Sequence, residues 1–143
     1  MLDLSTGKHL ILDLYGCKSV LLSDRIALLR FLDELPGRIS MSILSPAIVK
    51  EDKYPKCDIE DEGISGFVII HESHISVHTF TRRGFVELDV CSCKDFDEDA
   101  VTEIIGQAFM PEQIDAQLVR RGRLHRHAEH QKAGTEGKAS RPD

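Results

Sequence analysis

The order of apolar runs along the chain predicts an α+β fold, a two-layer α/β sandwich with a mainly antiparallel sheet and two helices on one face. Six short runs have the alternation or the Val, Ile and Phe content of strands, and two segments have helical periodicity. Two helices cannot cover both faces of a six-stranded sheet, so we expect both on the same face. A second copy of the chain is the simplest cover for the other face, which predicts a homodimer.

The first strand and the first helix are expected within the first 37 residues. Residues 9–15 form an almost continuous apolar run between two glycines, which predicts a well-buried strand. Ser23 is a suitable N-cap for a helix that starts at Asp24. The Pro36-Gly37 pair is expected to end that helix.

The next segment predicts a second strand and then a loop. Residues 39–49 alternate in part between apolar and polar side chains and predict a strand interrupted at Pro46. Residues 50–62 are polar, acidic and broken by a proline, so we expect a surface loop there.

The densest strand signal follows this loop. Three runs rich in Val, Ile and Phe, residues 66–70, 75–80 and 85–91, predict three successive strands. Arg82-Arg83-Gly84 predicts a tight turn between the last two.

A helix and a final strand complete the predicted domain, residues 1–121. The helix should start near Asp97 and end before Pro111, with one apolar face made of Val101, Ile104, Ile105 and Ala108. Residues 114–119 alternate and predict the last strand. The pattern is lost in residues 122–143, where we expect a disordered tail.

Composition narrows the possible functions. The formal charge is −6 and there is no Trp, so we expect no nucleic-acid partner, because phosphate contacts need clustered Lys and Arg. No apolar run approaches the length that spans a bilayer, and the N-terminus does not resemble a signal peptide. We therefore expect a cytoplasmic protein with reduced cysteines, without a membrane partner.

Residues 65–93 carry an unusual number of reactive side chains for a strand-rich segment. Several would lie near the buried surface, where polar groups need hydrogen-bond partners. The segment is therefore the candidate functional site, and its reactive residues are Ser65, His71, Glu72, Ser73, His74, Ser76, His78, Cys91 and Cys93.

Residue types alone leave three interpretations of this segment open. The first is a zinc site, but the histidine spacing suits a helix better than strands, so we expect no metal. The second is a nucleophile, Ser73 or Cys93, with His78 as its base, although no Gly-x-Ser-x-Gly elbow is present. The third is a purely structural role, which we expect for His71, His74, Ser76, Cys17, Cys57 and Cys91 if each is taken singly.

Four blocks of sequence resemble the prokaryotic S-adenosylmethionine decarboxylase proenzymes, in order and at the spacing of that family. They are residues 7–17 (GKHLILDLYGC), 63–66 (GISG), 72–80 (ESHISVHTF) and 88–93 (LDVCSC). The third block is highly specific, and the resemblance covers roughly residues 7–120.

The resemblance implies that the chain cuts itself between Glu72 and Ser73. The Ser73 hydroxyl would attack the Glu72 carbonyl, and the resulting ester would split into a β chain of residues 1–72 and an α chain of residues 73–143. Residue 73 would become a pyruvoyl group, the cofactor of the enzyme. By resemblance, His78 and Ser65 assist this processing.

The resemblance also implies what the cut enzyme does. The pyruvoyl ketone would form a Schiff base with the amine of a small-molecule substrate and withdraw electrons as carbon dioxide leaves. Cys93 matches the general acid that returns a proton, with Cys91 a weaker second candidate. The reaction would be decarboxylation of S-adenosylmethionine for spermidine synthesis, in a homodimer of cleaved α/β protomers.

Substrate recognition is where the chain departs from the family. Ile59 replaces an aromatic residue that stacks on adenine, and Arg82 replaces a glutamate that holds the ribose hydroxyls. An arginine cannot accept a hydrogen bond. Decarboxylation of arginine or ornithine, a binding relative that does not process itself, and stacking by another aromatic residue (Tyr54, Phe67 or Phe80) therefore stay open.

Overall fold

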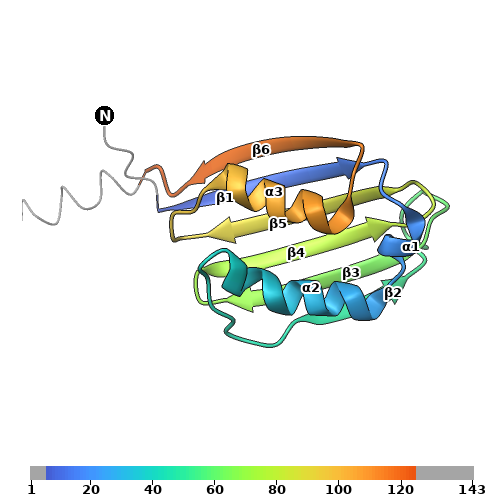
Figure 1. The fold of residues 1–143 in the computed structure, drawn as a ribbon, viewed down its shortest axis with the longest axis horizontal. Coiled ribbons are helices and arrows are strands. Elements are labelled where there is room, and N and C mark those ends of the chain that lie inside the picture. The colour runs from blue at the N-terminus through green and yellow to red at the C-terminus, as the bar shows by residue number, and fades with distance from the viewer. Residues whose placement is uncertain (1–5, 125–143) are drawn as a thin grey trace, which may run out of the picture.

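The computed structural model describes residues 6–124 as one antiparallel sheet with helices on one of its faces (Figure 1). The elements in chain order are β1 (Gly7–Tyr15), α1 (Ser19–Leu22), α2 (Arg25–Arg38), β2 (Ile48–Asp52), β3 (Gly63–Ile70), β4 (Ser73–Phe80), β5 (Phe85–Ser92), α3 (Glu98–Phe109) and β6 (Gln113–Arg121). The predicted α+β sandwich is confirmed, and the short helix α1 is an addition that the sequence did not indicate.

The strands lie in the order β2-β3-β4-β5-β1-β6, and all neighbouring pairs are antiparallel. β3, β4 and β5 follow one another directly as a meander, whereas β1 inserts between β5 and β6. Two pairs in this register matter for the site: Ser65 lies opposite His78, and Ser73 lies opposite Ser92.

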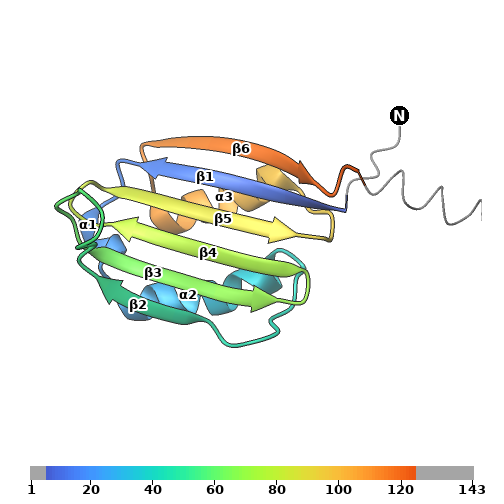
Figure 2. The ribbon, with the colours of Figure 1, turned by 180° about the vertical axis from the view of Figure 1, so that it is seen from behind.

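β1 is buried on one face only, although its apolar run predicted a well-buried strand. Leu10, Leu12 and Leu14 are almost fully buried beneath the helices, while His9, Ile11 and Asp13 are partly exposed on the other side. Figure 2 shows that no helix covers this second face, which we call the open face. The open face therefore carries the alternate residues of each strand.

The helix starts and stops differ in detail from the prediction. Asp24, not Ser23, caps α2, because its carboxylate accepts the Ala27 N–H at 3.0 Å. Ser23 instead ends α1, where its hydroxyl donates to the Ser19 carbonyl. α2 also continues through Pro36 to Arg38.

The predicted strand at residues 39–49 is wrong over most of its length. Only its last two residues belong to β2, and the predicted loop at residues 50–62 begins after Asp52. Before β2 the chain makes a single bridge, between Ile43 and Ile70. Pro46 has no N–H to give to a ladder, which accounts for the irregular backbone before β2.

Lys8 is a buried cation that holds the segment after β5. Its Nζ lies 2.6 Å from the Asp95 carboxylate and 3.0 Å from the Glu98 carboxylate, and it donates to the Phe96 carbonyl at 2.8 Å. The hydrogen bond to Asp95, opposed by burial, and the pairing with Glu98 raise the pKa of Lys8. Three partners thus fasten residues 95–98 to the start of β1.

Two further predictions concern the C-terminal tail and membrane-spanning segments. The predicted tail, residues 122–143, lies outside the described residues from position 125 onward. Among residues 6–124, no helix has the length and apolar character needed to cross a membrane.

Asp61 is a buried carboxylate that ties the β4–β5 turn to the start of β3. Its oxygens accept the backbone N–H groups of Glu62 at 2.7 Å, Arg82 at 2.9 Å and Arg83 at 3.2 Å. Burial alone would raise the pKa of Asp61, but these three N–H groups and the Arg83 guanidinium outweigh it and hold the pKa below its usual value. The ionised carboxylate therefore stabilises the folded state.

We expect Asp61→Asn to lower the free energy of unfolding by about 2 kcal/mol at pH 7, because an amide cannot satisfy three donors as a carboxylate does. A carboxyl group with a lowered pKa stabilises the fold above its unfolded pKa of about 3.9 and loses that contribution as pH falls through its folded pKa. The difference between the two proteins should therefore shrink below about pH 4. Urea titrations at several pH values measure this, with exposed Asp58→Asn as the control, and equal losses in both variants would contradict it.

Candidate active site

The peptide bond between Glu72 and Ser73 lies at the turn between β3 and β4. Ile70 pairs with Ser73 across this turn, so His71 and Glu72 form its two-residue tip. Ser73 is exposed, and its φ of 159° is close to fully extended backbone. The sequence places the turn here because the apolar alternation of both strands stops at these polar residues.

Cys93 lies next to this turn, immediately after β5. The backbone N–H of Cys93 donates to the carbonyl oxygen of Glu72 at 2.8 Å. This contact continues the β4–β5 ladder beyond the Ser73–Ser92 pair. A donor on this oxygen polarises the carbonyl and would stabilise the oxyanion that forms if a nucleophile attacks it.

Cys93 is exposed and its backbone contacts Glu72, whereas Cys91 lies two residues earlier, within β5, and is partly buried. Cys91 pairs with His74 on one side and His9 on the other. Of the two cysteines, Cys93 is therefore the one whose backbone contacts the cleavage turn.

Ser65 and His78 form a second pair, on the open face. They lie opposite each other on β3 and β4, and a hydrogen bond joins the Ser65 Oγ to the His78 Nδ1 over 2.8 Å. Both side chains are partly buried. An imidazole hydrogen-bonded to a hydroxyl can accept a proton and pass it on.

Within one chain, the two pairs lie apart. Ser73 and His78 are five residues apart on β4, which corresponds to about 16 Å at the rise of a β-strand. The structure thus brings Glu72, Ser73 and Cys93 together at one end of β4 and places Ser65 with His78 toward its other end. A single chain does not place His78 within reach of the Glu72–Ser73 bond.

Three other polar residues of the open face, His9, Ser76 and Asp89, form a separate network. Asp89 accepts from Ser76 over 3.3 Å and lies 3.1 Å from the Nε2 of His9. His74 stacks on Phe67, with ring centroids 5.3 Å apart. Between residues 6 and 124, no three His, Cys, Asp or Glu side chains are grouped so that they could hold a metal ion.

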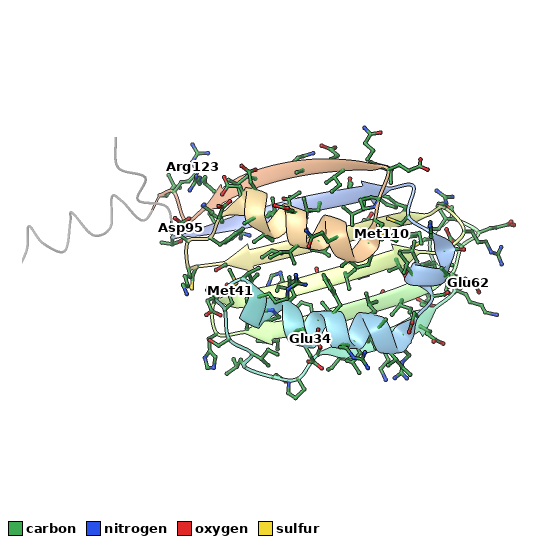
Figure 3. The ribbon with its side chains drawn as sticks, viewed as in Figure 1. Glu34, Met41, Glu62, Asp95, Met110 and Arg123 are labelled. Atoms are coloured by element: carbon green, nitrogen blue, oxygen red, sulfur yellow. The ribbon has the colours of Figure 1, made fainter. Side chains whose placement is uncertain are left out.

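The two residues that depart from the expected pattern, Ile59 and Arg82, line one cavity of about 310 Å³. Lys53, Glu60 and Glu62 contribute charges of both signs to the same cavity. Figure 3 shows Glu62 at the end of the molecule opposite to Met41 and Asp95. This cavity lies at the far end of β4 from Ser73 of the same chain.

The site also contains a residue that the sequence did not indicate. The Ser42 N–H and hydroxyl both donate to the Glu72 carboxylate, at 3.2 and 3.3 Å. Ser42 belongs to the segment that was predicted to be a strand, and no motif marks it. Only the fold, which brings residue 42 beside residue 72, identifies it.

Comparisons with known proteins agree with this geometry. The model of the family described as S-adenosylmethionine decarboxylase matches residues 8–122. An S-adenosylmethionine decarboxylase proenzyme of Methanococcus maripaludis is 32% identical over 119 residues, covering 81% of this chain and 89% of that protein. The corresponding proenzyme of Clostridium tetani is 30% identical over 117 residues, covering 81% and 86%. The crystal structure of the adenosylmethionine decarboxylase from Aquifex aeolicus superimposes with a TM-score of 0.68 at 26% identity, covering 82% of this chain and 92% of that one.

Proposed function

The chain belongs to the S-adenosylmethionine decarboxylase family, and from this premise we propose that it is a self-processing carboxy-lyase acting on S-adenosylmethionine. The observation that carries the proposal is the Glu72 carbonyl, held by the Cys93 N–H beside the Ser73 hydroxyl. The decarboxylated product would serve spermidine synthesis.

Self-cleavage would begin with attack of the Ser73 Oγ on the carbonyl carbon of Glu72. The C–N bond of the peptide breaks, the nitrogen takes the hydroxyl proton, and an ester joins Glu72 to the Ser73 side chain. The Cys93 N–H donates to the oxyanion between these states. Loss of the α-proton of residue 73 then expels Glu72 as a carboxylate, and water releases ammonia to leave a pyruvoyl group.

The residues at the turn fit this cofactor, because Ser73 supplies its three carbons and its exposed position leaves room for a substrate. Once formed, the pyruvoyl group supplies a ketone that captures the substrate amine and accepts the electrons released with carbon dioxide. The exposed Cys93, whose backbone contacts Glu72, would return the proton to the product carbon through its thiol.

The separation of the two residue pairs supports a dimer in which each site is shared. His78 and Ser65 lie on the open face, about 16 Å along β4 from the Ser73 of their own chain. Packing the open faces of two chains together would bring the Ser65–His78 pair of one chain toward the cleavage turn of the other. The open face also exposes large apolar side chains that a partner would cover, namely Ile48, Phe67, Ile69 and Val119.

The cavity lined by Ile59 and Arg82 also suits a second class of substrate, amino acids with a cationic side chain such as arginine and ornithine. Arg82 cannot accept a hydrogen bond from a ribose, and Glu60 and Glu62 offer charges that suit a cationic side chain. Aromatic stacking could come instead from Tyr54, which lines this cavity, or from Phe80, whose ring lies 4.9 Å from that of Tyr54. Release of labelled carbon dioxide from S-adenosylmethionine, arginine and ornithine, measured side by side, decides between them, and we expect S-adenosylmethionine to be the substrate.

Purified protein should contain two fragments, residues 1–72 and 73–143, the second with a keto-blocked terminus. Ser73→Ala removes the attacking hydroxyl, so we expect an intact and inactive chain of unchanged fold. Intact-mass spectrometry measures both, with Ser76→Ala, which leaves the turn untouched, as the matched control. Wild-type protein that consists only of uncut chain would refute self-processing.

Cys93→Ala should still cut itself, because the backbone N–H that holds the Glu72 carbonyl remains. Turnover should fall at least about a hundredfold, since the proton donor is lost. Cys91→Ala, two residues away, should keep most of the activity. Carbon dioxide release per cut chain measures both, and a Cys93→Ala enzyme with normal turnover would assign the proton to another group.

Mixed dimers test the shared site directly. A His78→Ala chain co-expressed with a differently tagged Ser73→Ala chain should be cut, because its partner supplies an intact His78. The same His78→Ala chain should stay whole alone, and also beside a Ser73→Ala/His78→Ala double variant. If the His78→Ala chain stays uncut beside the Ser73→Ala chain, His78 acts within its own chain, and if it cuts itself when alone, His78 is not needed for cleavage.

A further inference from the structure

Ser42 binds the cleavage turn, whose tip is formed by His71 and Glu72. Besides its two hydrogen bonds to the Glu72 carboxylate, Ser42 accepts the His71 N–H on its carbonyl at 2.9 Å. One residue thus contacts both residues at the tip of the turn, through backbone and side chain. The Ile43–Ile70 bridge places Ser42 there.

Lys94 links the segment that carries Ser42 to the segment that carries Cys93. The Nζ of Lys94 donates to the Ser40 carbonyl at 2.6 Å, so the segment after β5 is bound to the segment after α2. Ser40 has a φ of 59°, a conformation that costs energy for a residue other than glycine. Figure 3 shows Met41 and Asp95, the chain neighbours of these residues, at the same end of the molecule.

Together these contacts enclose Glu72. Ser42 binds the Glu72 side chain, and the Cys93 N–H binds the Glu72 carbonyl. The Lys94–Ser40 hydrogen bond joins the two segments that carry these residues. We call Ser40, Ser42 and Lys94 the turn clamp. Burial would raise the pKa of Glu72, but the Ser42 donors and the Lys94 charge outweigh it and keep the pKa below its ordinary value. Glu72 is therefore held as an anion.

We propose that Ser42 and Lys94 of the turn clamp are positioning residues for cleavage of the Glu72–Ser73 bond, a role that rests on the proposed self-processing. By fixing the Glu72 side chain, Ser42 keeps the carbonyl on the Cys93 N–H and oriented toward the Ser73 hydroxyl. Attack needs this alignment, and small displacements of the reacting atoms cost large factors in rate. After the cut, the same contacts retain Glu72 as the end of the β chain.

A purely structural role predicts a different outcome. Ser42 and Lys94 are exposed, and surface hydrogen bonds of this kind usually change stability little. Their replacement should thus leave the melting temperature nearly unchanged while it slows cleavage. Stability and cleavage rate are therefore separable readouts.

The test measures cleavage of newly synthesised full-length chain against time. Ser42→Ala should cut between about tenfold and a hundredfold more slowly than wild type, and Ser42→Thr, which keeps a hydroxyl, should recover most of the rate. Ser45→Ala is the matched control, because Ser45 meets β3 through its backbone N–H. Lys94→Met should also be slow, with exposed Lys18→Met as its control.

Hydroxylamine locates the affected step, because it cuts esters but not peptide bonds under mild conditions. If the clamp serves the attack on the Glu72 carbonyl, hydroxylamine should not speed the cleavage of Ser42→Ala, since little ester forms. Fast cleavage in both Ser42→Ala and Lys94→Met, or slow cleavage matched by an equal fall in melting temperature, would overturn the proposal. Wild-type chain that never cuts would instead refute the proposed function itself.

Discussion

The hydrogen bond from the Cys93 N–H to the Glu72 carbonyl is the contact on which the site depends. It exists because β3, β4 and β5 pair as a meander in one register, which ends β5 beside the turn between β3 and β4. A slip of one residue would turn every side chain of a strand to the other face and remove Cys93 from this position. The buried residues of these strands, among them Ile75, Val77, Leu88 and Val90, therefore protect the site by fixing the register.

Much of this architecture could be predicted from the sequence, for identifiable reasons. The apolar residues Val, Ile, Leu and Phe alternate along β3 to β6, and this two-residue period predicts strands. Asp97 caps α3 as expected. Residues 39–47 also alternate in part, but Pro46 prevents a regular ladder, and only tertiary contacts show where the segment goes. The predicted end of α2 at Pro36-Gly37 was too early, because Pro36 lies within the last turn of the helix, where it is buried together with Leu35.

The site was predictable in its residues but not in its arrangement. Resemblance indicated Ser65, Glu72, Ser73, His78 and Cys93, and these lie on, or directly at the ends of, the adjacent strands β3, β4 and β5. The hypothesis that His78 is the base for Ser73 requires the two side chains to meet, yet extended backbone separates them along β4 of one chain. No motif marks Ser42 or Lys94. Ser42 reaches Glu72 across 30 residues of chain, and Lys94 is hydrogen-bonded to Ser40 and acts on Glu72 through its charge.

If the chain cuts itself as proposed, the strand order has a consequence for the lifetime of the cut protein. β1, β2 and β3 belong to residues 1–72, whereas β4, β5 and β6 belong to residues 73–143, and β1 lies between β5 and β6. The two fragments are therefore interleaved, and neither can leave without breaking ladders on both sides of β1 as well as the β3–β4 ladder. Such cleavage would turn a unimolecular folding reaction into a bimolecular one, so a cut molecule that unfolds would have to find its other half at a rate set by concentration. The working lifetime of the mature protein is then a kinetic property, governed by how rarely the joined sheet opens.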